Sequence, residues 1–105
     1  LKNQVFAVTV INVHVQLTYF FSRMVPGQGT LDLQIAQGTR LSELLAVIAE
    51  QHNFQFRQAL LDRNGFLHPE IAVVLDHQFV SSSRFDVIRI KRDCRIKILP
   101  LVSGG

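Results

Sequence analysis

The sequence contains a single cysteine and no tryptophan among its 105 residues. One cysteine excludes an internal disulfide framework and any zinc site built from several cysteines, and it fits a reducing compartment. The aromatic residues are eight phenylalanines and one tyrosine, and phenylalanine rings need no hydrogen-bond partner when they are buried. We therefore expect a cytoplasmic protein with a core dominated by phenylalanine.

Long apolar runs are also missing. The stretch 5–13 is apolar but is interrupted by Thr9 and Asn12, and it is well short of the roughly 20 residues that span a bilayer. It is not followed by the small-residue cleavage site of a secretory signal. We expect residues 1–12 to form an extra strand or a loosely held arm, and we expect no membrane partner.

Charge of one sign is not concentrated enough to indicate a nucleic-acid partner. Eleven lysine and arginine residues stand against eight acidic residues, a net charge of +3. The basic residues are spread along the chain except in the segment 84–97, whereas nucleic-acid binding requires a clustered basic face. We interpret this segment as a solvated strand face, with docking to an acidic partner surface as the functional alternative.

The first half of the chain predicts a β-hairpin within one globular domain. The length, with 48% hydrophobic and 18% charged residues, suits a single core. Residues 13–21 and 30–35 alternate apolar and polar side chains, which is typical of strands with one buried face. Turn residues lie between them, at 26–29, so the two strands are expected to pair antiparallel.

A helix is predicted after this hairpin. Apolar residues recur at helical spacing from about residue 39 to Asn53, at Leu41, Leu44, Leu45, Ile48 and Ala49. Thr39 or Ser42 is expected to cap this helix. Residues 54–61 are loosely patterned, and Asp62-Arg63-Asn64-Gly65 is typical of a turn.

Several short strands are expected in the second half. The continuous apolar run 71–75 predicts a strand buried on both faces. Residues 79–80 and 87–90 are expected to be short strands around a loop at 81–83, and 95–99 alternates as a final strand.

This order of elements predicts an α+β fold of the β-grasp type, a mixed sheet of four to five strands packed on one main helix. The domain is expected to span residues 13–100, with the last strand central and beside the first. Residues 101–105 would then leave the sheet as a flexible tail.

The last seven residues, 99–105, read Leu-Pro-Leu-Val-Ser-Gly-Gly. Residues without side chains let a backbone thread a narrow channel, so a partner can reach the terminal carboxylate. That group is an anion at neutral pH and a poor electrophile, which an ATP-dependent adenylation would activate for attack by sulfur. Catalysis would then reside in partners, and we expect no enzyme activity. A tail with no function is the alternative.

The tail and the element order together resemble the MoaD/ThiS family of β-grasp, ubiquitin-like sulfur carriers, and the tail is most similar to the small subunits of molybdopterin synthase. The resemblance covers about residues 13–105, and the segments 19–23, 42–45 and 98–105 carry it. It implies activation by an E1-like adenylyltransferase that uses ATP. It also implies sulfur transfer to the large subunit of molybdopterin synthase or to another sulfur-accepting enzyme.

The resemblance also assigns roles to residues. Gly105 is the modified residue, and the segment inserted into partners consists of Pro100, Leu101, Val102, Ser103 and Gly104. Phe21, Phe79 and Leu99 fall where the family presents an apolar patch to partners, with ordinary core or scattered surface as the alternative. No bound cofactor is implied, because ATP belongs to the activating partner.

Two departures from the family pattern affect the choice of pathway. Leu101 stands where a second proline is common, and Arg92-Asp93-Cys94 replaces the usual turn before the last strand. The remaining proline favours molybdopterin or tungstopterin synthesis. Three alternatives stay open: a carrier for thiamine or another pathway, a ubiquitin-like modifier conjugated to lysines through Gly105, and an interaction module whose tail is incidental.

The sequence gives little support for a metal site or a nucleotide-binding loop. The four histidines, His14, His52, His68 and His77, lack the i,i+4 spacing of metal ligands, and Cys94 is far from them in sequence. We therefore expect no metal site. The turn Gly27-Gln28-Gly29 lacks the further glycine and the helix of a nucleotide-binding loop.

Overall fold

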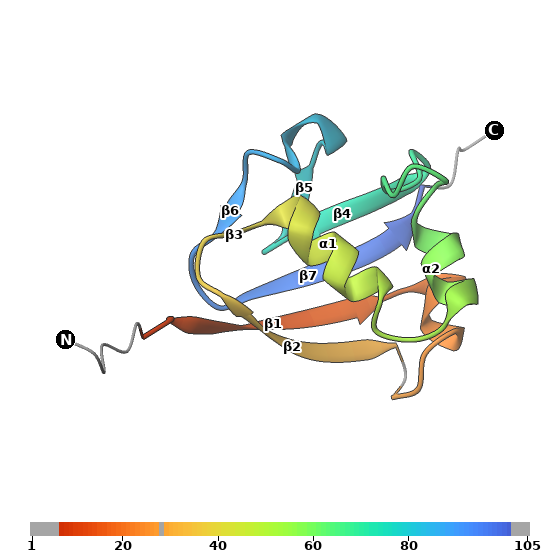
Figure 1. Cartoon of the computed structure of the whole chain (residues 1–105). Coiled ribbons are helices and arrows are strands. Elements are labelled where there is room, and N and C mark those ends of the chain that lie inside the picture. Colours follow the sequence, from red (N-terminus) through yellow and green to blue (C-terminus); the bar gives the residue numbers. More distant parts are fainter. Residues whose placement is uncertain (1–6, 28, 102–105) are drawn as a thin grey trace.

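The computed structural model describes residues 7–27 and 29–101 (Figure 1). The elements follow in the order β1 (Val10–Leu17), the 3-10 helix η1 (Tyr19–Arg23), β2 (Thr30–Ala36), β3 (Thr39–Arg40), α1 (Leu41–Ala49), α2 (Phe54–Leu60), β4 (Ile71–Leu75), β5 (Gln78–Val80), the 3-10 helix η2 (Ser82–Arg84), β6 (Arg89–Ile90) and β7 (Cys94–Pro100).

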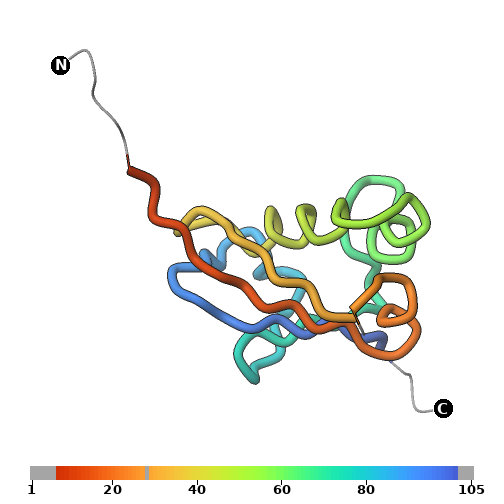
Figure 2. Tube along the Cα trace, turned by 90° about the horizontal axis from the view of Figure 1, so that it is seen from below, coloured from red at the N-terminus to blue at the C-terminus, as the bar shows by residue number. Residues whose placement is uncertain are grey.

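The predicted α+β architecture is confirmed. Five strands form one mixed sheet in the order β2-β1-β7-β4-β5, and β3 pairs with β6 in a separate two-stranded sheet. The last strand, β7, is central and lies parallel to β1, whereas β1–β2, β4–β7 and β4–β5 are antiparallel. Seen from below, β2, β1 and β7 run side by side, and α1 and α2 lie together on one side of them (Figure 2).

The first strand is shifted relative to its predicted range. It begins at Val10, so the end of the predicted N-terminal arm already belongs to the sheet. It ends at Leu17, because Tyr19 has a positive φ of 55° and the chain turns into η1. Residues 19–21 are therefore not part of the strand. The alternation within β1 is as predicted, with its apolar side chains buried at Ile11, Val13, Val15 and Leu17.

The main helix is shorter than predicted, and its cap is different. Arg40 is the N-cap, and its backbone N–H donates to Oε1 of Glu43 at 3.1 Å. Thr39 instead donates its hydroxyl to the carbonyl of Ala36 at 2.6 Å, and Ser42 lies inside the helix. The prediction that Thr39 or Ser42 caps the helix is therefore wrong.

A second helix, α2, follows α1 where no element was predicted. Oδ1 of Asn53 accepts a hydrogen bond from the N–H of Phe56 at 2.9 Å and caps it. Phe56 and Leu60 are one helical repeat apart, and both are fully buried. Two turns with two buried positions give too short a periodic signal to identify a helix from sequence.

The core is mainly aliphatic, contrary to the expectation from composition. Within the described residues only Phe21, Phe56 and Phe85 are buried phenylalanines, while four others are exposed: Phe20, Phe54, Phe66 and Phe79. Leucine, isoleucine and valine from both helices and the central strands fill the space between the sheet and the helices. Exposed apolar residues mark interaction surfaces where they form a contiguous patch.

Candidate functional site

The tail leaves the protein from the central strand. β7 alternates, with Cys94, Ile96 and Ile98 buried on the helix side, and it ends at the half-buried Pro100. The N–H of Leu101 donates to the carbonyl of Glu70 at 2.5 Å, and Leu101 is 54% exposed. The rest of the predicted insertion segment, Val102, Ser103 and Gly104, and the predicted modified residue Gly105 lie outside the described residues.

An apolar surface lies next to this exit, on the face of the sheet that the helices leave open. Val74 lies opposite both Phe79 and Lys97 in the ladder, and Ala72 lies opposite Leu99. Opposite residues share a face of the sheet, so Ala72, Val74, Phe79 and Leu99 share the open face. We call these four residues, together with Leu101, the tail-side patch.

Exposure within the tail-side patch is uneven. Phe79 is 71% exposed, Leu99 and Val74 are half-buried, and Ala72 is buried. Phe79, Ala72 and Leu101 also line one groove of about 420 Å³, together with residues before β4 and after β5. Phe79 and Leu99, two of the three residues predicted for a partner-facing surface, thus share the open face of the sheet, and Leu99 lies two residues before Leu101.

The third predicted patch residue, Phe21, is not on the surface. Its side chain is fully buried, because η1 turns it toward the core. Its ring instead supports that of Phe20, with the ring centroids 4.2 Å apart, and Phe20 is 51% exposed. The prediction that Phe21 belongs to an exposed patch is therefore wrong.

The segment that holds Phe20 is tied to the exit of the tail. η1 contacts β7, and Thr18 just before it donates two hydrogen bonds to the carbonyl of Ile98. Within η1, the hydroxyl of Ser22 donates to the carbonyl of Tyr19 at 2.6 Å. These bonds hold the exposed rings of Tyr19 and Phe20 at the end of the sheet from which the tail departs.

Val74 was not predicted as a surface residue, whereas Ala72 is buried, as the apolar run predicted. The continuous apolar run of β4 was interpreted as a strand buried on both faces, yet Val74 faces the open side and is only half-buried. The pairing of β4 with β7 determines which β4 residues share a face with Lys97 and Leu99. This register is known only from the tertiary structure, so the sequence alone could not show that Val74 faces outward.

Beyond the patch, the open face is polar and partly basic. Arg95 and Lys97 point outward from β7, as expected for a solvated strand face. The other basic residues of the segment 84–97 lie on different elements, and Arg89 donates to the carbonyl of Gly38 at 2.9 Å. The segment is therefore not one continuous strand face.

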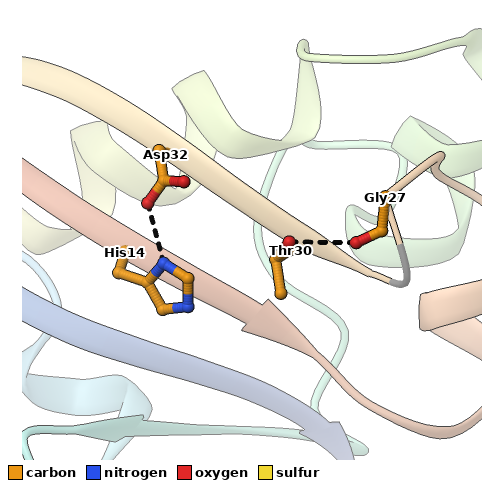
Figure 3. Close-up of polar contacts among 4 residues, drawn as sticks. All are labelled: His14, Gly27, Thr30 and Asp32. Carbon is orange, nitrogen blue, oxygen red and sulfur yellow. Dashed lines mark hydrogen bonds and ion pairs between the residues drawn. The ribbon is translucent and has the colours of Figure 1, made fainter.

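Polar contacts also lie between the strands and in the turn of the β1–β2 hairpin. Nδ1 of His14 lies 2.7 Å from Oδ1 of Asp32 across β1 and β2, and the hydroxyl of Thr30 donates to the carbonyl of Gly27 at 2.9 Å (Figure 3). Apart from the His14–Asp32 contact, the described part of the chain holds one ion pair, between Arg57 and Glu50.

Cys94 has the properties of a core residue rather than a nucleophile. It is buried at the start of β7. Burial, together with the negative charges of Asp76 and Asp93, raises the pKa of its thiol to about 11, so the reactive thiolate is scarce at neutral pH.

Two further properties concern the described residues only. No group of three or more histidine, cysteine, aspartate or glutamate side chains in 7–27 and 29–101 is arranged to hold a metal ion. In the same residues, no helix has the length and apolar character needed to cross a membrane.

Comparison with solved structures shows the same fold in several small proteins. Small archaeal modifier protein 1 from Methanosarcina acetivorans has a TM-score of 0.72 and 18% identity, covering 92% of this chain and 99% of that one. A Pyrococcus furiosus protein assigned as molybdopterin converting factor subunit 1 has a TM-score of 0.64 and 18% identity, covering 88% and 99%. A chain of the BexX/CysO complex from Amycolatopsis orientalis has a TM-score of 0.64 and 24% identity, covering 89% and 99%.

These identities are low, and the structural matches show the β-grasp fold alone. No curated protein matches the sequence. The family comparison is more specific, because the model of the ThiS family matches residues 19–105. This range includes η1, both helices, the central strand β7 and the whole tail. The chain therefore belongs to the ThiS family of small ubiquitin-like carrier proteins.

Proposed function

We propose that this chain is a sulfur carrier whose Gly105 carboxylate is adenylated by an E1-like enzyme and converted to a thiocarboxylate. It donates this sulfur in molybdopterin or tungstopterin biosynthesis in the cytoplasm. The chain is a protein substrate and binds no cofactor, because ATP is used by the activating partner. The large subunit of molybdopterin synthase, or another sulfur-accepting enzyme, receives the tail.

The chemistry requires two steps and no net oxidation or reduction. The Gly105 carboxylate is an anion at neutral pH, since its reference pKa is about 3.3–3.7. One of its oxygens attacks the α-phosphorus of ATP, and pyrophosphate leaves. Hydrosulfide then attacks the acyl carbon, the bond to the AMP oxygen breaks, and the resulting thioacid loses its proton.

The observation that carries this proposal is the position of the tail-side patch. Leu101 continues directly from the central strand and lines the same groove as the exposed Phe79. A partner that covers the apolar patch is thereby positioned to receive the residues that follow Leu101. The likeness to a protein assigned as molybdopterin converting factor subunit 1 supports the choice of pathway.

The proposal is tested by incubating the chain with an E1-like adenylyltransferase, ATP and sulfide. Intact-mass analysis is expected to show the gain that accompanies exchange of one oxygen for one sulfur. A chain that lacks Gly104 and Gly105 is the matched control and is expected to keep its mass. An unchanged mass of the full chain with every E1-like enzyme tried would overturn the proposal.

The acceptor is tested separately with the thiocarboxylated protein. Transfer of its sulfur to a molybdopterin precursor on the large synthase subunit is the expected result. Transfer only in a thiamine-forming system would assign the carrier to that pathway instead.

A second candidate function is conjugation of Gly105 to lysine side chains of other proteins. It is favoured by the likeness to small archaeal modifier protein 1. Lysine-linked adducts in cells that produce the tagged chain would favour this function. Thiocarboxylate without such adducts favours the carrier.

A further inference from the structure

The strand β2 forms one edge of the five-stranded sheet, and half of its peptide groups face away from β1. The N–H of Leu17 donates to Gly29 at 2.7 Å, and the N–H of Gln37 donates to Thr9 at 2.8 Å. In an antiparallel pair, hydrogen-bonded residues alternate, so the odd-numbered residues of β2 bond to β1. The peptide groups at its even positions, 30, 32, 34 and 36, therefore face outward.

Two of these outward groups already have partners within the chain. The N–H of Thr30 donates to the carbonyl of Gly27 at 3.3 Å, and the carbonyl of Ala36 accepts from the hydroxyl of Thr39 at 2.6 Å. The groups left over are the carbonyl of Thr30, the N–H of Ala36, and both peptide groups of Asp32 and Gln34. Within the described chain, none of these six has a hydrogen-bond partner.

We propose that this edge pairs with β2 of a second copy of the chain, antiparallel and centred on Leu33. In this register Asp32 lies opposite Gln34 of the other copy and can exchange two hydrogen bonds with it. Thr30 lies opposite Ala36 of the other copy, and the N–H of Ala36 donates to the free carbonyl of Thr30. The N–H of Thr30 and the carbonyl of Ala36, which are already bonded within each chain, are the two groups that face one another across this pair. Every outward group that is free in the single chain therefore gains a partner in the dimer.

The side chains are complementary in the same register. On the helix side, Leu31 meets Ile35 of the other copy and Leu33 meets its own counterpart. Leu31 and Leu33 are only half-buried in the single chain, so the pairing covers apolar surface. Asp32 is the only charged residue of β2, and it meets an amide rather than a like charge.

Neighbouring registers are less favourable. A shift by one pair in one direction places Asp32 opposite Asp32, which opposes two negative charges. A shift in the other direction places the N–H of Asp32 against the carbonyl of Ala36, which Thr39 already occupies. β2 also has neither proline nor a break in its ladder with β1, two devices that commonly protect an edge.

The resulting dimer leaves the tails free. β2 is the edge opposite to β5, so the tail-side patches lie at the two outer ends of a continuous ten-stranded sheet. The two-fold axis is perpendicular to the sheet and keeps both open faces on the same side. One strand pair buries less than the roughly 1,200 Å² of a stable interface, so the dimer is expected to depend on protein concentration.

The register is tested by placing single cysteines on β2 in an oxidising thiol buffer. Residue 33 meets itself at the two-fold axis, where the opposed Cα atoms are about 4.5 Å apart and within disulfide range. We expect Leu33→Cys to form a covalent dimer. Asp32→Cys and Gln34→Cys are matched controls, because each lies about 7–8 Å from its own counterpart on the diagonal and is expected to remain monomeric.

A second variant keeps the test independent of the folding of Leu33→Cys. Gln34→Pro removes an outward N–H that β1 does not use, so the fold is expected to persist, as its amide spectrum would show. Sedimentation at high protein concentration should then detect loss of the dimer that the unmodified chain forms. A folded Leu33→Cys that stays monomeric, equal cross-linking at 32, 33 and 34, or self-association unchanged by Gln34→Pro would each overturn the proposal.

Discussion

Thr18 and Ile98 are joined by two hydrogen bonds, since the N–H and the hydroxyl of Thr18 both donate to the Ile98 carbonyl at 3.1 Å. These two hydrogen bonds connect the end of β1 to β7, the strand from which the tail leaves. Thr18→Val keeps the side-chain shape and removes the hydroxyl donor, so the free energy of unfolding should fall by about 1 kcal/mol in urea titrations. Thr30→Val, which loses a bond in an exposed turn, should cost less. Equal losses would contradict the argument.

Gly29 is expected to be the glycine least tolerant of a side chain. It has a φ of +80°, and an added Cβ would lie 2.6 Å from Cβ of Ser22 in η1. Gly65 is the matched control, with a φ of +83° and open space around it. Gly65→Ala should cost about 1–2 kcal/mol from backbone strain alone, and Gly29→Ala distinctly more, in the same urea titrations. Comparable costs would show that η1 yields to the new methyl group.

The elements whose buried faces the sequence predicted correctly are those with long periodic patterns. β1, β2, α1 and β7 each repeat apolar residues over at least seven positions, so their buried faces follow from spacing. The helix α2 was not predicted, because its two buried positions are too few to establish a period.

The partner-facing surface was only partly predictable, for a different physical reason. Three aromatic residues follow one another at 19–21, and the chain turns at Tyr19, which has a positive φ, into a 3-10 helix that buries Phe21 and leaves Phe20 exposed. A left-handed conformation at a tyrosine has no signature in sequence. Val74 was assigned to the core because an apolar residue has the same pattern whether it faces a core or a partner.

Phe79 is expected to contribute to partner binding and not to stability. Its ring is 71% exposed, so Phe79→Ala should leave the urea midpoint nearly unchanged. It should raise the KM for tail adenylation by an E1-like enzyme about tenfold or more, as loss of an exposed aromatic anchor does at protein interfaces. Phe54→Ala is the matched control, since Phe54 is 67% exposed on α2 and outside the tail-side patch. Equal effects on KM would remove the patch from the interface.

Phe21 should behave in the opposite way to Phe79. Its ring is fully buried, and truncation of such a ring leaves a cavity. Phe21→Ala should therefore lower the free energy of unfolding by about 3–5 kcal/mol, as measured by thermal or urea denaturation. A small loss of stability would mean that the surroundings of η1 collapse into the space.

Ionisation of Cys94 is expected to make the free energy of unfolding depend on pH in the alkaline range. Burial first, and the carboxylates of Asp76 and Asp93 in addition, raise the pKa of its thiol from 9.0 to about 11. The thiol of the unfolded chain therefore loses its proton at a lower pH than the thiol of the folded chain. Because the unfolded state then binds fewer protons than the folded state, the free energy of unfolding falls as pH rises. The free energy of unfolding should decline between pH 9.0 and about 11. Cys94→Ala lacks the titrating group, so urea titrations across this range should give a smaller decline for this variant. The same decline in both proteins would assign the pH dependence to other groups.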